Sequence, residues 1–272
     1  MASANEITVA QFQRLVGLPD APQIVDVRID EHFAADPRMI PGSGRRDYRT
    51  VTEWAPEYAG RRVVVLCQLG LKLSQGAAAW LRASGANAEA LAGGFEAYRD
   101  AGGLLYDSRR LPPHDALGRT LWVTRARPKV DRIACPWLIR RFIDASAVFL
   151  FVTPSDVADV ADRFGATPFD IEGVHWSHRG ERCTFDTMLD EFGLRSSALD
   201  RLATIVRGAD TERHDLAPEA AGLLAASVGY SRMYRDDLEQ LAAAMSLYDA
   251  FYRRCRDAGE ETHDWPSPGS AT

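Results

Sequence analysis

The chain has 272 residues, a length that suggests about two domains of ordinary size. Hydrophobic residues make up 46% of it and charged residues 26%, which excludes disordered, collagen-like and coiled-coil proteins. With 32 Lys and Arg against 38 Asp and Glu, the formal net charge is −6, so a general coat of nucleic acid is not expected.

The cysteines and the N-terminus indicate a reducing compartment. Cys67, Cys135, Cys183 and Cys255 form no CxxC pair and no compact disulfide framework, so we expect reduced thiols. The N-terminus lacks the basic and apolar regions of a signal peptide, and no apolar run approaches the ~18 residues of a membrane helix. We expect a cytoplasmic protein without membrane insertion and without a nucleic-acid partner; a homodimer stays open.

The first hundred residues predict a layered α/β domain. Two β-branched runs, 23–28 and 62–67, are too short for helices and too apolar for half-exposed strands, so they predict buried parallel strands. Helical patterns alternate with these strands over residues 9–16, 52–58, 74–84 and 95–101. This alternation predicts a parallel sheet with helices on both faces.

The composition changes after this domain. Paired glycines at 102–103 and paired prolines at 112–113 indicate a linker. We expect a first domain at 1–105, a linker at 106–119, a helix-rich α+β domain at 120–258 and a flexible tail at 259–272. The second domain has predicted strands at 121–124 and 148–152, and predicted helices at 136–143, 185–192, 198–206, 218–227 and 236–255.

Cys67 is the first candidate catalytic residue. It ends a predicted strand, and a glycine-bearing loop leads from it to a helix that we expect to begin at Ser74 and stop at Gly85. Loop amides and a helix N-terminus stabilise a thiolate and can hold an anion. The predicted anion-binding loop comprises Gln68, Leu69, Gly70, Leu71, Lys72 and Leu73. A small buried core cysteine is the alternative.

Residues 5–105 resemble a rhodanese domain. The resemblance lies in the strand IVDVR, the turn Ile40-Pro41-Gly42, the cysteine loop and the segment LAGGFEAYRDAGG. It implies that Cys67 carries a persulfide, taken from a small sulfur-containing anion such as thiosulfate and passed to a nucleophile. It also implies that loop amides hold the donor.

The loop departs from the rhodanese pattern in two places. Active rhodaneses commonly show Cys-x-x-Gly-x-Arg-Ser, whereas here Lys72 stands in place of the Arg and Leu73 precedes Ser74. A phosphatase of this fold would need an arginine at Leu73, so phosphatase chemistry is disfavoured. Asp26 and Arg28 are expected to form a structural ion pair rather than an acid–base pair.

The second domain opens with a basic segment. Pro136 suits the first position of a helix, which would place Cys135 beside the helix N-terminus. Basic side chains around a helix start attract anions and lower the pKa of a thiol. The candidate oxyanion site comprises Arg127, Lys129, Asp131, Arg132 and Cys135. The alternative is a solvated basic surface over a buried cysteine.

A third cysteine stands before another predicted helix. His178 lies in the loop that leads to it, Cys183 precedes the helix, and Asp186 lies in its first turn. These three residues are candidate metal ligands, and Asp210 is a further candidate; structural roles are the alternative. Cys255 lies on an apolar helical stripe and is expected to be inert packing.

Residues 120–255 resemble the C-terminal domain of the chromate-resistance (ChrB-like) family. The resemblance lies in the segments 127–144, 169–194, 205–211, 217–229 and 236–252. It implies chromate resistance or sensing. Together the two domains predict a sulfurtransferase-type protein linked to chromate resistance, with thiol chemistry at Cys67 and a second domain that binds an oxyanion or a metal ion. A chromate- or metal-responsive regulator without catalysis is the alternative, and no other cofactor is expected.

Overall fold

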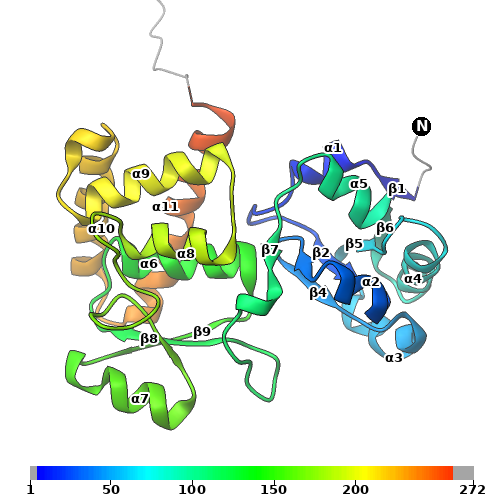
Figure 1. Ribbon diagram of the computed structural model, residues 1–272, viewed down its shortest axis with the longest axis horizontal. Coiled ribbons are helices and arrows are strands. Elements are labelled where there is room, and N and C mark those ends of the chain that lie inside the picture. Colours follow the sequence, from blue (N-terminus) through cyan, green and yellow to red (C-terminus); the bar gives the residue numbers. More distant parts are fainter. Residues whose placement is uncertain (1–4, 260–272) are drawn as a thin grey trace, which may run out of the picture.

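The computed structural model describes residues 5–259, so almost all of the predicted tail lies outside it. Figure 1 shows two bodies side by side, an α/β domain formed by the first half of the chain and a helix-rich domain formed by the second. No helix among the described residues is long and apolar enough to cross a membrane.

The first domain is built on a five-stranded sheet in the order β1-β6-β5-β2-β4, in which every paired strand is parallel. This confirms the predicted parallel sheet. The strands are β1 (Glu6–Ile7), β2 (Gln23–Asp26), β4 (Ser43–Arg45), β5 (Arg62–Leu66) and β6 (Asn87–Leu91). The helices are α1 (Val9–Gln13), α2 (Asp30–Ala35), α3 (Val51–Trp54), α4 (Lys72–Ala83) and α5 (Gly94–Asp100).

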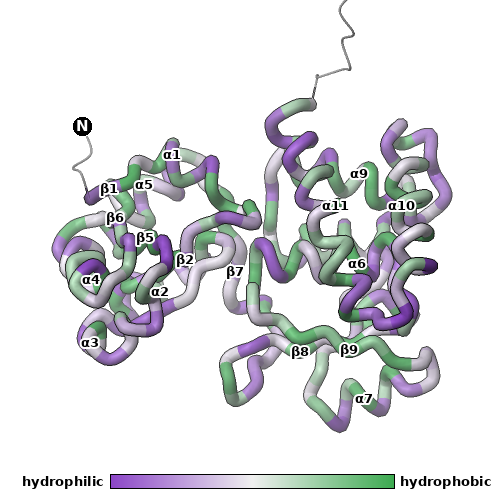
Figure 2. The backbone as a smooth tube through the Cα atoms, turned by 180° about the vertical axis from the view of Figure 1, so that it is seen from behind, coloured by the Kyte–Doolittle hydropathy of each residue, from purple (hydrophilic) through white to green (hydrophobic). Residues whose placement is uncertain are grey.

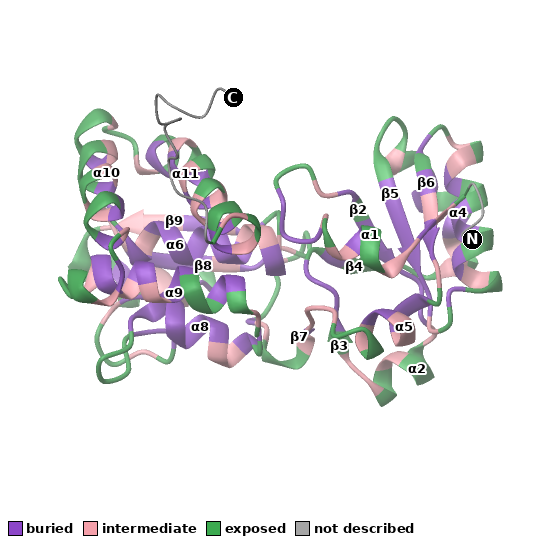
Figure 3. Ribbon diagram, turned by 90° about the horizontal axis from the view of Figure 1, so that it is seen from above, coloured by how far each residue is buried: buried purple, intermediate pink, exposed green. Residues whose placement is uncertain are grey.

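Strand β5 shows why the sheet needs helices on both faces. Its residues alternate between two apolar clusters: Val63 and Val65 pack with α4, while Val64 and Leu66 pack with the other face. All four side chains are fully buried, as the purple colour of β5 in Figure 3 shows. A strand buried on both faces must be apolar throughout, which is the pattern that predicted it.

The second domain contains a three-stranded parallel sheet in the order β10-β8-β9. Its strands are β8 (Leu121–Arg125), β9 (Val148–Val152) and β10 (Thr167–Pro168). One helix, α7 (Val157–Phe164), lies on one side of the sheet, and the remaining helices lie on the other (Figure 1). They are α6 (Asp131–Leu138), α8 (Thr184–Phe192), α9 (Ser197–Asp210), α10 (Ala220–Met233) and α11 (Asp237–Asp257). In Figure 2, β8 and β9 are largely hydrophobic.

Helix α6 corrects the prediction for Pro136. The helix begins at Asp131, five residues earlier than expected, so Pro136 lies inside it and Cys135 is not beside its N-terminus. A proline there cannot donate to the carbonyl one turn back. The helix continues beyond Leu138 as a π-helical turn, η4 (Ile139–Ile143).

The predicted linker takes part in both domains. Strand β7 (Tyr106–Asp107) pairs antiparallel with β3 (Arg38–Met39), while the Tyr106 side chain joins the apolar core of the second domain. The domains also touch directly: the Gly42 amide donates to the Phe142 carbonyl at 3.2 Å. A Cβ at Gly17 would lie 2.5 Å from the Phe142 ring, so only glycine allows this close packing.

Candidate functional sites

Cys67 lies directly after β5, at the carboxyl edge of the parallel sheet, and is 5% exposed. Open α/β sheets commonly bind ligands at this edge. Its Sγ lies 3.3 Å from the Ser74 hydroxyl. Ser74 is not the N-cap that the sequence predicted, because α4 already begins at Lys72; its hydroxyl instead donates to the Leu71 carbonyl at 3.1 Å.

The loop after Cys67 is held tightly against the start of α5. The amides of Phe95 and Glu96 donate to the carbonyls of Cys67 and Gln68 at 2.9 and 3.1 Å. Gly70 has a φ of +68°, and a Cβ there would lie 2.4 Å from the Leu91 carbonyl oxygen. Glycine is therefore required at this position, since a side chain would push the loop off α5.

The backbone amides of this loop have no acceptor in the part of the chain that the structure describes. Among residues 5–259, no hydrogen bond is donated by the backbone amides of residues 68–74, although the carbonyls of Cys67, Gln68 and Leu71 all accept one. Free amides that lead into a helix N-terminus form a site for negative charge. They follow a nearly buried cysteine along the chain. That these amides and the Cys67 thiol form one anion site stays the prediction made from the sequence.

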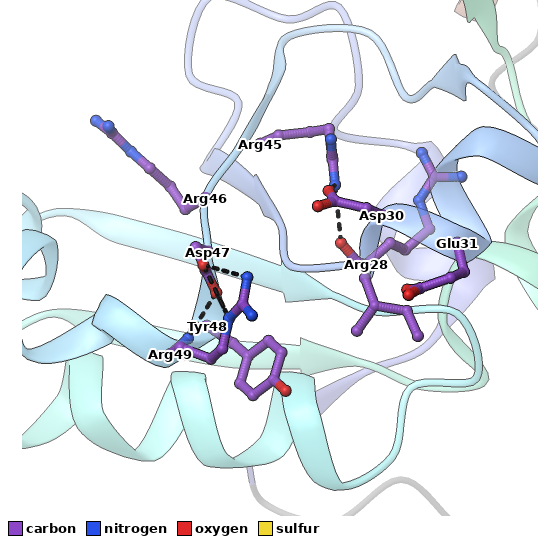
Figure 4. Close-up of a pocket in the computed structure, with 9 residues that line it drawn as sticks. Arg28, Asp30, Glu31, Arg45, Arg46, Asp47, Tyr48 and Arg49 are labelled. Carbon is purple, nitrogen blue, oxygen red and sulfur yellow. Dashed lines mark hydrogen bonds and ion pairs between the residues drawn. The ribbon is translucent and has the colours of Figure 1, made fainter.

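A hollow of about 600 Å³ lies near the ends of β2 and β4. Figure 4 shows several arginines around it, and each of their guanidinium groups has a carboxylate partner. Arg45 pairs with Asp30 at 2.8 Å and Arg49 with Asp47 at 2.8 Å. The remaining pairs are Arg28–Asp26 and Arg46–Glu57. The Arg28–Asp26 pair is buried and confirms the structural ion pair that the sequence predicted. Because the charges are matched, the hollow offers no free cation for an oxyanion.

The predicted basic cluster of the second domain does not converge on one point. Arg127 reaches the α10–α11 side, where its guanidinium contacts Ser231 and its amide donates to Asp237. Arg132 pairs with Asp170 at 3.3 Å, and Lys129 is exposed.

Cys135 is fully buried in mid-helix, and burial, reinforced by the Asp131 carboxylate, raises the pKa of its thiol. The predicted lowering of that pKa is therefore wrong. The cause is the earlier start of α6, which places Cys135 inside the helix and a carboxylate at its N-terminus.

The predicted metal ligands also separate. Cys183 is the N-cap of α8 and is fully buried; its amide donates to Asp186 at 3.1 Å, and burial raises the pKa of its thiol. Asp186 pairs with Arg207 at 3.0 Å. His178 points elsewhere, into a cluster of aspartates. Cys255 is buried in the core, as expected.

His178 lies at the centre of a cluster that it forms with three aspartates, Asp131, Asp170 and Asp210. Its Nε2 lies 3.2 Å from Asp210, 3.3 Å from Asp170 and 3.5 Å from Asp131. One ligand atom from each of Asp131, Asp170 and His178 lies within 4.8 Å of the others, a spacing that can hold a metal ion. A hollow of about 560 Å³ is lined by Asp170 and His178, so a solute can reach the cluster.

The charges of the cluster influence one another strongly. Hydrogen bonds to Asp170 and Asp210 raise the pKa of His178 to about 10. Burial, with the two neighbouring carboxylates, raises the pKa of Asp131 well above its ordinary value. Burial also opposes ionisation of Asp170, but hydrogen bonds from His178 and Thr184 outweigh it and lower that pKa. Strongly shifted pKa values beside a hollow are typical of functional sites.

The cluster lies at the carboxyl edge of the second sheet, as Cys67 does in the first. Asp170 follows β10, and Asp131 is the first residue of α6 after β8. Sequence analysis included Asp131, His178 and Asp210 but missed Asp170. Its one sequence signal is its position two residues after a short strand, which became visible only once β10 was paired with β8.

These features define a two-domain protein with a cysteine-bearing loop at the edge of one parallel sheet and an aspartate–histidine cluster at the edge of another. Residues 8–101 match the rhodanese-like domain family, and residues 122–255 match the family of the ChrB C-terminal domain. The chain therefore joins a rhodanese-like domain to a ChrB C-terminal domain.

Known relatives match parts of the chain. Protein ChrB of Cupriavidus metallidurans is 38% identical over 147 residues, which are 52% of this chain and 44% of that protein. The chain thus spans less than half the length of this curated relative. A solved structure of SSP1007 from Staphylococcus saprophyticus is 24% identical and covers 36% of this chain and 96% of its own, with a TM-score of 0.32. A rhodanese-related protein from Thermoplasma volcanium is 20% identical, and the match covers 37% of this chain and 96% of that protein, with a TM-score of 0.33.

Proposed function

We propose that this protein is a sulfurtransferase linked to chromate resistance, with Cys67 as the carrier of sulfane sulfur. The observation that supports this most strongly is that the nearly buried Cys67 opens a loop whose backbone amides at 68–74 have no acceptor within residues 5–259. The match to a rhodanese-like domain supports the same chemistry, and the match to a ChrB domain supports the link to chromate.

In the first step the Cys67 thiolate attacks the outer sulfur of a donor such as thiosulfate. The donor's S–S bond breaks, sulfite leaves with the electron pair, and Cys67 becomes a persulfide. The loop amides and Lys72 hold the negative charge of donor and persulfide. In the second step a nucleophile such as cyanide takes the outer sulfur and returns the thiolate, so no external oxidant or reductant is needed.

The test is the transfer of sulfur from thiosulfate to cyanide by the full chain. We expect thiocyanate formation by the wild type, and a loss of about 10³-fold or more in Cys67→Ser, because the nucleophile is removed. Cys183→Ser is the matched control and should keep the wild-type rate. A wild type no faster than Cys67→Ser would refute the proposed activity.

A second candidate function is cation binding by the ChrB domain, which suits a metal-responsive regulator. The supporting observation is the convergence of Asp131, Asp170 and His178, with Asp210 beside them. Carboxylates with one imidazole suit ions such as Mn²⁺ or Zn²⁺. Since these side chains come from the start of α6, from the segment 170–178 and from the end of α9, a bound ion would tie these three segments together.

This binding should depend on pH. An ion must displace the proton from His178, whose pKa is raised to about 10. Each ion therefore releases at least one proton below that pH, and the affinity should rise at least about tenfold per pH unit between pH 6 and 9, more steeply wherever Asp131 is also protonated. Calorimetry with Mn²⁺ and Zn²⁺ in buffers of different ionisation enthalpy measures the affinity and the number of protons released. Binding that survives in Asp170→Asn together with His178→Gln would place the ion elsewhere.

A further inference from the structure

Strand β9 forms one edge of the parallel sheet in the second domain. In the order β10-β8-β9, its only strand neighbour among the described residues is β8. Helices lie on both sides of this sheet, so its faces are covered (Figure 1). The edge of a sheet differs from its faces, because an edge strand presents backbone groups that no neighbouring strand uses.

Two residues of β9 direct their backbone groups away from β8. The Val148 amide donates at 3.0 Å to the carbonyl of Thr120, the residue that precedes β8. Backbone groups alternate in direction along a strand, so those of Phe149 and Phe151 point to the outer edge. Within residues 5–259, no further strand, turn or side chain is hydrogen-bonded to the amide or the carbonyl of either phenylalanine.

This edge lacks the features that commonly protect an exposed strand. Charged residues, prolines and bulges keep such edges from pairing with another chain. The segment from Ala145 to Thr153 has no charged residue and no proline, and the register with β8 is regular along all of β9. Every side chain of β9 except that of Phe149 is only half-buried. Apolar surface therefore accompanies the unpaired backbone groups.

The sequence of β9 fits a second copy of itself. It is VFLFV, which is the same in both directions and is centred on Leu150. If two copies pair antiparallel about a twofold axis at Leu150, Phe149 faces Phe151 of the second copy and Val148 faces Val152 of the second copy. Opposed residues of an antiparallel hydrogen-bonded pair exchange both N–H···O bonds. The two phenylalanines have outward backbone groups, so this register joins the groups that have no partner.

The charges near the two ends of β9 agree with this register. The Arg140 guanidinium lies 3.4 Å from the Ala147 carbonyl, next to the start of β9, and forms no ion pair within the described residues. Asp156, beyond the end of β9, is exposed and likewise has no ion pair there. Antiparallel pairing brings the start of one strand to the end of the other, so the cation of each copy approaches the anion of the other.

We propose that β9 is a dimerisation surface and that its partner is β9 of a second copy of this chain. The pairing joins two three-stranded sheets into one continuous sheet across the twofold axis. A single short strand pair buries less than the ~1,200 Å² of a typical stable interface, so the dimer dissociates on dilution.

The test follows mass and hydrogen exchange of the full chain as its concentration is raised. We expect sedimentation velocity to show a monomer–dimer equilibrium over a roughly hundredfold range of concentration. The amides of Phe149 and Phe151 should exchange about tenfold more slowly at the highest concentration than at the lowest, because they become hydrogen-bonded only in the dimer.

A proline at the outer edge provides the variant. Phe151→Pro removes an amide that bonds in the dimer but not to β8, and proline is tolerated on edge strands. We expect the dissociation constant of the dimer to rise at least about tenfold, since each copy loses a hydrogen bond. Phe164→Ser removes an exposed apolar side chain of α7 and is the matched control, which should keep the dimer.

Three results would overturn the proposal: a monomer at every concentration, a dimer whose formation leaves exchange at Phe149 and Phe151 unchanged, or slow exchange of these amides already in the monomer. The second would place the interface elsewhere, and the third would show that the chain covers this edge itself. If Phe151→Pro does not fold, the exchange measurement on the wild type decides.

Discussion

The two domains place thiols in similar positions in sequence and give them different surroundings. Cys67 and Cys183 each stand just before a helix. At the start of α8, the backbone amides of Thr184 and Phe185 donate to the Asp131 carboxylate. The backbone amides of residues 68–74, by contrast, have no acceptor among the residues that the structure describes. A thiol before a helix is therefore a candidate nucleophile only where the helix N-terminus is free.

The largest expected difference concerns alkylation. We expect iodoacetamide to modify Cys67 in the folded protein, and to modify Cys135 and Cys183 about 10³-fold more slowly or worse, because fully buried thiols react only after opening of the core. Peptide mapping during the reaction measures all four thiols at once. Equal rates for Cys67 and Cys183 would remove the contrast between the two domains.

The second prediction concerns Asp131, whose carboxylate accepts hydrogen bonds from the backbone amides at the start of α8. Asp131→Ala leaves the buried amides of Thr184 and Phe185 without an acceptor, and should lower the free energy of unfolding by about 3 kcal/mol. Asp131→Asn retains one acceptor oxygen and should lower it less. Urea denaturation measures both, and a loss below about 1 kcal/mol in the alanine variant would show that Asp131 does not hold this helix.

The third prediction concerns the shape of the free loop. Gly70→Ala would place a Cβ 2.4 Å from the Leu91 carbonyl oxygen, so the loop must shift away from α5. We expect sulfur transfer to fall about thirtyfold. Gly76→Ala, on the open side of α4, has no neighbour within 4 Å and is the control for helix content. Equal transfer rates in the two variants would contradict the role given to the loop conformation.

The smallest expected effect is the pH dependence at His178. Its folded pKa of about 10 exceeds the ordinary 6.5, so its charge stabilises the folded state fully below pH 6.5. That contribution is lost as the pH rises through 10. The difference in unfolding free energy between wild type and His178→Gln, in metal-free buffer, should thus be largest near pH 6 and vanish above pH 10. A difference that grows with pH would contradict the assignment.

The sequence predicted those parts that depend on local pattern. Strand β5 is a run of β-branched residues, and the bounds predicted for strand β9, Val148–Val152, agree with the observed ones. Gly85 and Gly193, which were predicted to end their helices, both have a positive φ. Strand β6, with the sequence NAEAL, was missed because alanines have little preference for strands, and its neighbours β1 and β5 hold it in place.

The candidate sites were only partly predictable for a related reason. Cys67 and its loop are contiguous in sequence, so their juxtaposition is local. The His178 cluster depends on the pairing of β8 with β10, which joins segments far apart in sequence. Asp170 also has a φ of +52°, which no sequence pattern predicts. The helix start predicted at Pro136 was wrong. Proline usually lies in the first turn of a helix, whereas here α6 begins at Asp131 and continues past Pro136 into a π-helical turn.

The central claim is tested most directly by the intact mass of the protein after incubation with thiosulfate and removal of excess donor. We predict a gain of ~32 Da, one sulfur atom, that maps to the peptide containing Cys67 and is released by cyanide. An unchanged mass, or added sulfur that maps to Cys135, Cys183 or Cys255 instead, would contradict the account.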